Sequence, residues 1–213
     1  MALHLGDTAP DFTAPSTAGD ISFHDWAGDS WVVLFSHPAD FTPVCTTELG
    51  RVGQLQSEWD ARGVLPIAVS VDSAEDHAAW RPQIESYGRT TVGYPIIADS
   101  DKAVAELYDM IHPGEGDTSS VRSVFVIDPA KKIRLSITYP KSVGRNFDEI
   151  LRAIDALQTT DRAAVSTPVD WRQGEKIIVP PTVSTDDARE RFDDVEEHLP
   201  YLRTASIRET STV

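Results

Sequence analysis

The sequence is poor in cysteine, in long apolar runs and in basic residues, and each shortage excludes a class of protein. Its single cysteine, Cys45, excludes a disulfide within the chain and is typical of a reducing cytoplasm. No apolar run approaches the roughly 20 residues that span a bilayer, and residues 1–7 lack the pattern of a signal peptide. A formal net charge of -15 leaves no basic stripe for nucleic acid and argues against association with an anionic membrane.

The residues that are present have the composition of an ordinary globular protein, with 40% hydrophobic and 25% charged residues. Five short apolar runs predict strands: 31–36, 64–71, 96–98, 121–127 and 133–138. The turn sequence of residues 128–131 predicts that the last two form an antiparallel hairpin, and Asn146 predicts the start of a final helix. This order predicts an α/β fold with a central mixed, mostly parallel sheet, one antiparallel side and helices on both faces.

Helical patterns separate the predicted strands. Four apolar residues recur at near-helical spacing after residue 45: Leu49, Val52, Leu55 and Trp59. Gly63 is suited to stop this helix. Ser73 with Asp76 predicts the start of another helix, which Pro82 ends, kinks or begins anew. Ser100 predicts the cap of the next helix.

The chain is expected to have two parts, a main domain over residues 1–160 and a C-terminal extension over residues 161–213. In the extension the periodicity fades, and only a short strand at 176–179 and a helix at 186–192 are predicted. Residues 203–213 are polar and are expected to be mobile. The extension is too short for a large core of its own, so it is expected to pack on the main domain or on a partner subunit.

Cys45 occupies an activating position, although a lone cysteine is more often an inert small hydrophobe. Thr42 is a favourable N-cap and Pro43 suits the first helical position, so Cys45 falls in the first turn of a helix. Backbone N–H groups and the helix dipole favour a thiolate there. The second cysteine of a Cys-x-x-Cys motif would stand at position 48, which is Glu48, so an oxidised sulfur needs an external thiol.

The run Pro38-Ala39-Asp40-Phe41-Thr42-Pro43-Val44-Cys45 matches the Pro-x-x-x-Thr-x-x-Cys signature of peroxiredoxins. The chain resembles their one-cysteine (peroxiredoxin-6-like) subfamily, within the AhpC/TSA thioredoxin-fold peroxidases. Further stretches extend the resemblance over nearly the whole chain: 73–77, 121–128, 135–140, 144–151 and 167–171. The resemblance implies a thioredoxin-like fold and an antioxidant peroxidase for hydrogen peroxide and organic hydroperoxides, without metal or prosthetic group. It also implies homodimers, larger rings of dimers, and an extension at the dimer interface.

The resemblance implies a role for each matching residue. Cys45 corresponds to the peroxidatic thiolate, and Thr42 to the hydroxyl that orients the peroxide. Arg122 corresponds to the arginine that stabilises the thiolate and hydrogen-bonds the peroxide oxygens, a task suited to a forked, always-charged group. Pro38 corresponds to the proline that shields the site from water. The product is a sulfenic acid, which thioredoxin, glutathione, another small thiol or ascorbate reduces.

Three more positions match residues close to this centre. Glu48 and Arg145 resemble the partners that orient Arg122, and His37 occupies a position near the sulfur. Without the resemblance, Arg122 is better explained as a structural ion-pair partner of Glu48 or of an acidic neighbour. The histidines show no close metal-ligand spacing, so structural zinc is not expected.

Two other functions are alternatives to peroxide reduction. Some members of the subfamily also hydrolyse phospholipids at a Gly-x-Ser-x-Gly-like site, and Gly28-Asp29-Ser30 with His24 upstream partly resembles it. Position 32 is valine instead of glycine, and the family's aspartate position corresponds to Ala130, so Ser30 is also explained as the start of a strand. A redox-dependent chaperone or sensor assembly is the non-enzymatic alternative.

Overall fold

The computed structural model describes residues 3–208, which form two compact units, one ending at Phe147 and one beginning at Asp148. No helix of the described residues is long and apolar enough to cross a membrane. The predicted boundary between residues 160 and 161 stays a prediction.

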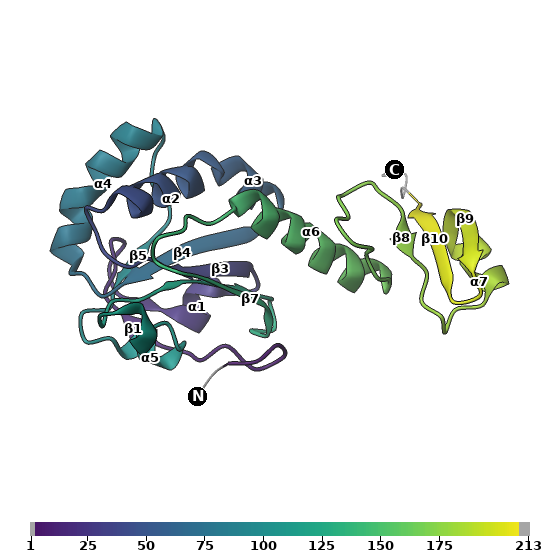
Figure 1. Cartoon of the computed structure of the whole chain (residues 1–213), viewed down its shortest axis with the longest axis horizontal. Helices are drawn as coiled ribbons and strands as arrows, with labels where there is room; N and C mark the ends of the chain where they lie inside the picture. Colours follow the sequence, from purple (N-terminus) through teal and green to yellow (C-terminus); the bar gives the residue numbers. More distant parts are fainter. Residues whose placement is uncertain (1–2, 209–213) are drawn as a thin grey trace. The chain divides into compact units, whose positions relative to one another are not determined.

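The first unit is built on a five-stranded sheet with the order β5-β4-β3-β6-β7 (Figure 1). Its strands are β3 (Trp31–Ser36), β4 (Val64–Ser70), β5 (Ile96–Ala98), β6 (Arg122–Ile127) and β7 (Ile133–Tyr139). β4 runs parallel to β3 and β5, whereas β6 runs antiparallel to β3 and β7. The mixed sheet and its antiparallel side are as predicted, and the hairpin of β6 and β7 is confirmed.

Helices cover both faces of this sheet, with α2 and α4 on one side and α1 and α5 on the other (Figure 1). The helices of this unit are α1 (Phe23–Ala27), α2 (Pro43–Gln54), α3 (Gln56–Ala61), α4 (Ala74–Gly88), α5 (Ala103–Leu107) and the 3-10 turn η1 (Pro113–Glu115). A short hairpin of β1 (Thr13–Ala14) and β2 (Ile21–Ser22) precedes α1 and was not predicted.

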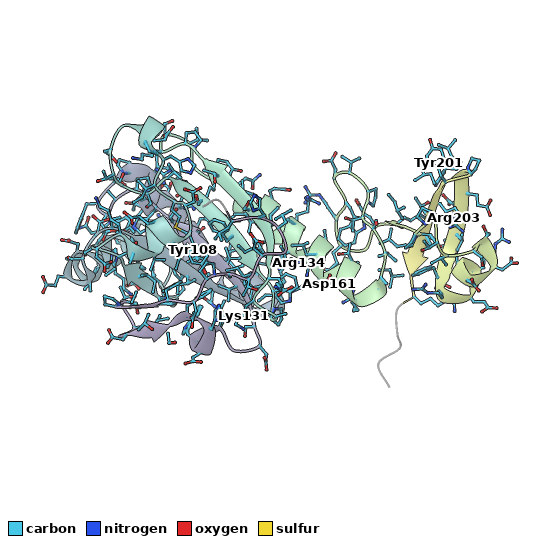
Figure 2. All side chains as sticks on the ribbon, turned by 90° about the horizontal axis from the view of Figure 1, so that it is seen from below. Tyr108, Lys131, Arg134, Asp161, Tyr201 and Arg203 are labelled. Atoms are coloured by element: carbon cyan, nitrogen blue, oxygen red, sulfur yellow. The ribbon has the colours of Figure 1, made fainter. Side chains whose placement is uncertain are left out.

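The alternation of side chains along the strands divides the core between these two faces. On the α1 and α5 side, one buried cluster includes Phe23, Leu34, Ile67, Val104 and Phe125. Tyr108 packs edge-on against Phe125 in this cluster and donates its hydroxyl hydrogen to the Pro10 carbonyl (Figure 2). On the opposite face of β3, Phe35 contacts Tyr94 and Phe147.

The helix boundaries differ from the prediction at two places. The predicted helix after Cys45 is broken at Leu55 into α2 and α3, although Gly63 ends it in a left-handed conformation as expected. Ser100 does not cap α5, which begins after Lys102. The Asp99 carboxylate accepts the N–H groups of Val104 and Ala105 instead.

The sequence left open whether Pro82 ends, kinks or restarts a helix, and in the structure it neither ends nor restarts one. It lies inside α4, which is continuous from Ala74 to Gly88. The predicted start is confirmed, because Ser73 and Asp76 form a reciprocal capping box.

The second unit has a small core of its own beside the end of α6 (Phe147–Ala163), whose first residue belongs to the first unit. Its other elements are β8 (Ile177–Ile178), α7 (Thr185–Arg191), β9 (Phe192–Leu199) and β10 (Leu202–Ile207). The strands form an antiparallel sheet in the order β8-β10-β9. Trp171, Ile177 and Phe192 are among its buried side chains.

The expectation of a mobile end was wrong for residues 203–207, which belong to β10. Arg203, labelled in Figure 2, is buried. It donates hydrogen bonds to the carbonyls of Pro180 and Val183 and to the Thr185 hydroxyl. These bonds join β10 to the first residue of α7 and to the chain that precedes it. Residues 209–213 lie outside the described part of the chain.

Candidate active site

Cys45 lies where the chain turns from the carboxyl end of β3 into α2. Thr42 has the extended conformation of an N-cap, Pro43 begins the helix, and Cys45 is its third residue. The cysteine side chain is free and completely buried. Phe41 adopts a left-handed conformation with φ of 55°, which is unfavourable for a bulky residue and is typical of a strained functional turn.

Thr42 is the N-cap residue of α2, as predicted, but its hydroxyl makes no capping hydrogen bond to the helix N–H groups. It donates to the Ala39 carbonyl at 2.8 Å, while the Thr42 carbonyl accepts from the N–H and the hydroxyl of Thr46. Because a hydroxyl has one hydrogen, the remaining capacity of Thr42 Oγ1 is to accept a hydrogen bond.

Arg122, at the start of β6, is the residue whose hydrogen bond reaches the sulfur. Its Nη1 lies 3.4 Å from Cys45 Sγ and 2.7 Å from Glu48 Oε2. Its Nε and Nη2 donate to the carbonyl of Lys141 at 2.9 and 2.6 Å. All three guanidinium nitrogens of Arg122 therefore have hydrogen-bond acceptors, and the guanidinium plane has a fixed orientation beside the thiol.

Glu48 lies one turn after Cys45 on α2 and joins two arginines. Its Oε1 accepts from the backbone N–H and Nε of Arg145, and its Oε2 accepts from Arg145 Nη2 and Arg122 Nη1, all within 2.7 to 2.9 Å. Burial alone raises the pKa of Glu48, but the charge and hydrogen bonds of Arg145, with the charge of Arg122, outweigh it and hold the pKa below its ordinary value.

The charges of this cluster do not cancel without the cysteine. Two guanidinium groups face one carboxylate, and all three side chains are buried. A thiolate at Cys45 would bring the sum to zero, whereas a neutral thiol leaves a buried positive charge uncompensated. The site therefore favours an anion at the sulfur position, which is the reactive form of a cysteine.

The predicted residues fall into two groups in the structure. Hydrogen bonds connect Cys45 with Arg122, Glu48 and Arg145. Within residues 3–208, no hydrogen bond joins the sulfur to Thr42, His37 or Pro38, although all three belong to the turn that leads to it. Pro38 and His37 are buried, and the His37 carbonyl accepts from the Ser120 hydroxyl.

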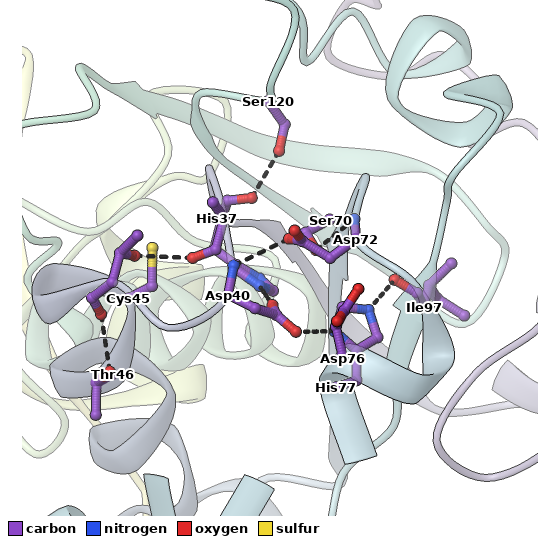
Figure 3. A network of polar contacts seen from close by, with 12 residues as sticks. His37, Asp40, Cys45, Thr46, Ser70, Asp72, Asp76, His77, Ile97 and Ser120 are labelled. Carbon is purple, nitrogen blue, oxygen red and sulfur yellow. Dashed lines mark hydrogen bonds and ion pairs between the residues drawn. The ribbon is translucent and has the colours of Figure 1, made fainter. Parts of the chain in front are cut away.

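A second buried network begins in the same turn (Figure 3). The Asp40 carboxylate lies between the rings of His37 and His77, at 2.8 Å from His37 Nε2 and 2.5 Å from His77 Nδ1. These three residues could hold a metal ion, since their ligand atoms lie within 4.8 Å of one another. The direct hydrogen bonds between them are the geometry of a proton-sharing network, so we assign no metal here.

Sequence reasoning missed Asp40 and His77. Asp40 lies inside the recognised motif, but the variable positions of that motif carry no assigned role. His77 comes from α4, far along the chain, and only the fold brings it to the turn.

Ser30 and His24 do not form a hydrogen-bonded pair in the described residues. The Ser30 N–H donates to the Ala27 carbonyl, and His24 Nε2 is bonded to the Ala9 carbonyl. The Nδ1 atom of His24 lies 3.9 Å from the Asp11 carboxylate.

Comparison with known proteins agrees with the fold. Residues 5–136 match the model of the AhpC/TSA family, and residues 156–194 match the C-terminal domain of 1-Cys peroxiredoxin. The chain is 50% identical to the mitochondrial peroxiredoxin PRX1 of Saccharomyces cerevisiae over 208 residues, which is 94% of this chain and 80% of that protein. It is also 50% identical to peroxiredoxin-6 of Mus musculus over 198 residues, covering 89% of this chain and 88% of that one.

Solved structures show the same similarity. The yeast mitochondrial 1-Cys peroxiredoxin aligns with a TM-score of 0.90 and 49% identity, over 96% of this chain and 99% of that one. The C45S mutant of peroxiredoxin 6 of Arenicola marina aligns with a TM-score of 0.92 and 44% identity, over 98% of this chain and all of that one. The fold and the site thus define a thiol-dependent peroxidase of the AhpC/TSA family. Within that family, the chain belongs to the 1-Cys peroxiredoxins.

Proposed function

We propose that this chain reduces hydrogen peroxide and organic hydroperoxides at Cys45, with Arg122, Thr42 and Pro38 completing the reaction centre. The observation that carries the proposal is the 3.4 Å contact between Arg122 Nη1 and Cys45 Sγ, inside a buried cluster whose charge a thiolate balances. Glu48 and Arg145 support it by fixing the guanidinium group of Arg122.

The reaction is a two-electron transfer from sulfur to the peroxide. The Cys45 thiolate attacks the terminal oxygen of the hydroperoxide, the S–O bond forms and the O–O bond breaks. The departing oxygen takes a proton and leaves as water or an alcohol, and Cys45 becomes a sulfenic acid. The Arg122 guanidinium stabilises the negative charge that develops on that oxygen, and the Thr42 hydroxyl accepts a hydrogen bond from the peroxide O–H.

The sulfenic acid is reduced by an external thiol, because the chain has one cysteine. A thiolate attacks the sulfenic sulfur and releases water, and a second thiol attacks the mixed disulfide to restore Cys45. The glutathione and thioredoxin systems resolve the thiol of the yeast relative, and a reductant of this kind suits our chain. Another small thiol or ascorbate remains an alternative.

Assembly and location complete the proposal. We infer a homodimer that can form larger rings of dimers, with residues 1–160 as the peroxidase domain and residues 161–213 at the dimer interface. The matches to the two family models support this inference. The single cysteine suits a reducing compartment such as the cytoplasm.

Stopped-flow measurement of peroxide consumption by the purified chain tests the activity. We expect rapid reaction in the native protein and none in Cys45→Ser, and peroxide consumption that survives this substitution would contradict the proposal. Arg122→Lys keeps the charge but loses the fork, and should lower the rate by about 100-fold. Arg134→Lys, on the neighbouring strand β7, is the matched control and should leave the rate unchanged.

Mass spectrometry of the peroxide-treated protein identifies the reductant. With candidate thiols added one at a time, a sulfenic acid at Cys45 should give way to a mixed disulfide with the competent thiol. An oxidised cysteine that no thiol restores would rule out the recycling step.

A further inference from the structure

Arg122 depends for its orientation on two acceptors, the Glu48 carboxylate and the backbone carbonyl of Lys141. The carbonyl accepts from Nε and Nη2 of Arg122, and the carboxylate accepts from Nη1. Glu48 is buried and is held by Arg145, whereas Lys141 lies just after β7, in a segment of mostly exposed residues. The carbonyl can therefore position Arg122 only if the chain at Lys141 is itself fixed.

Two contacts fix the chain at Lys141. Arg122 and Tyr139 form the end pair of the β6–β7 hairpin, and the chain continues beyond both of them. The backbone N–H of Lys141 donates to Glu115 Oε2 at 3.2 Å, and its ammonium group donates to Asp117 Oδ1 at 2.5 Å. Both acidic residues precede β6 in the chain, so these contacts join Lys141 to the segment that leads into Arg122.

Asp117 is ordered by the turn in which it lies. Its Oδ1 also accepts from the N–H and the hydroxyl of Ser119, at 2.8 and 2.6 Å. The hydrogen bond from Lys141, together with those from Ser119, lowers the pKa of Asp117, so the group is a carboxylate at neutral pH. The next residue, Ser120, is buried and donates its hydroxyl hydrogen to the His37 carbonyl, which anchors this segment to the turn before α2.

The ion pair is the contact that depends on the residue type at position 141, since any residue there supplies a carbonyl. The Lys141 side chain is 18% exposed and that of Asp117 is 68% exposed. An ion pair with one partner in water is weak, so its effect is expected to be small. Because it lies at the carbonyl that holds Arg122, even a small effect is transmitted to the reaction centre.

We propose that Lys141 and Asp117 are positioning residues of the peroxidase, because their ion pair fixes the Lys141 carbonyl that holds Arg122 beside Cys45. The contacts lead from the Asp117 carboxylate to the Lys141 ammonium, and from the Lys141 carbonyl through the guanidinium group to the sulfur. Neither side chain has to contact the peroxide. The effect on the rate rests on the proposed function, whereas the effect on Arg122 does not.

Hydrogen exchange of the Arg122 Nε–H group, followed by NMR of the arginine-labelled full chain, tests the positioning without peroxide. This hydrogen is bonded to the Lys141 carbonyl, so it exchanges with water when that bond opens. We expect exchange about two- to fivefold faster in Lys141→Gln and in Asp117→Asn. Lys141→Arg keeps the charge and should exchange like the native chain. Native exchange in Lys141→Gln, or equal acceleration in Lys141→Gln and Lys141→Arg, would overturn the proposal.

The rate with peroxide separates positioning from a direct effect of the Lys141 charge on the thiolate. If the ion pair positions Arg122, Lys141→Gln and Asp117→Asn should both lower the second-order rate by about two- to fivefold. Both should also move the pH–rate profile to higher pH, because a less firmly held guanidinium group stabilises the thiolate less. If the lysine charge instead acts directly, Asp117→Asn removes an opposing negative charge and raises the rate. A raised rate in Asp117→Asn would therefore overturn the proposal.

Lys176→Gln is the matched control, because it removes an ion pair of the same length, with Glu196 in the second unit. It should change neither the exchange nor the rate. If Cys45→Ser consumes peroxide as the native chain does, the peroxidase function fails, and the exchange of the Arg122 hydrogen still decides the positioning. If the native chain consumes peroxide through Cys45 while Lys141→Gln matches it in exchange and rate, only the positioning fails.

Discussion

Glu48 is the residue on which the charges of the reaction centre depend, since both of its oxygens are hydrogen-bonded to arginine. In Glu48→Gln, two buried guanidinium groups lose their counterion. We expect a loss of about 3–5 kcal/mol in the free energy of unfolding, measured with urea. The rate with peroxide should fall too, because Arg122 is no longer held beside the sulfur.

The pH dependence of this loss has a definite sign. The pKa of Glu48 in the folded protein lies below its ordinary value. Its contribution to the free energy of unfolding is therefore fully present above the pKa of the unfolded chain, and it is lost as the pH falls through the pKa of the folded protein. The difference in stability between the native chain and Glu48→Gln should therefore shrink in acid.

Glu58→Gln is the control, because it removes the carboxylate of the more exposed ion pair with Arg62. It should lower the free energy of unfolding by at most about 1 kcal/mol. Equal losses in both variants would contradict our view of Glu48.

At the same scale, the sequence predicted part of the site and missed the rest for a physical reason. Cys45 was predicted from its place in a helix turn, and the motif and resemblance supplied Arg122, Glu48 and Arg145. Asp40 and His77 are 37 positions apart, and only the packing of α4 beside the turn makes them a pair.

Among the elements, the contact between α2 and the chain that follows α4 is unusually close. A Cβ atom at Gly53 would lie 2.9 Å from both the Thr91 carbonyl and the Thr90 methyl group. Gly53→Ala gains about 0.5–1 kcal/mol in helix propensity, but overpacking costs about 1–3 kcal/mol. We expect a net loss, seen in thermal unfolding as a lower Tm.

Gly114→Ala is the control for this loss. A Cβ there would meet no atom within 4 Å, so Tm should change little. A higher Tm in Gly53→Ala would show that α2 and the chain after α4 move apart at no cost.

The elements were predictable where a local pattern decides them. Runs of apolar residues predicted β3, β4 and β5, and turn residues predicted the hairpin of β6 and β7. β9 was missed because seven of its eight residues, Asp193–Leu199, are partly or fully exposed and include four acidic side chains. Its pairing with β10 depends on backbone bonds, for which side-chain pattern gives no signal.

On the scale of the whole molecule, acidity is the property that no single element explains. The chain has 34 acidic and 19 basic residues, and its two units each have their own core. Like charges repel one another more in the compact state than in the unfolded chain, so a large net charge destabilises the fold.

Added salt should therefore raise the stability of this protein. The Debye length falls to about 10 Å at 0.1 M ionic strength, which screens most repulsion between exposed charges. We expect Tm to rise by about 2–4 °C for each kcal/mol of repulsion removed, with most of the rise below about 0.2 M sodium chloride. Neutralising two exposed carboxylates, in Asp20→Asn with Asp29→Asn, should reduce the rise. A Tm that does not respond to salt would mean that the acidic residues are already balanced by their local ion pairs, such as Lys141 with Asp117.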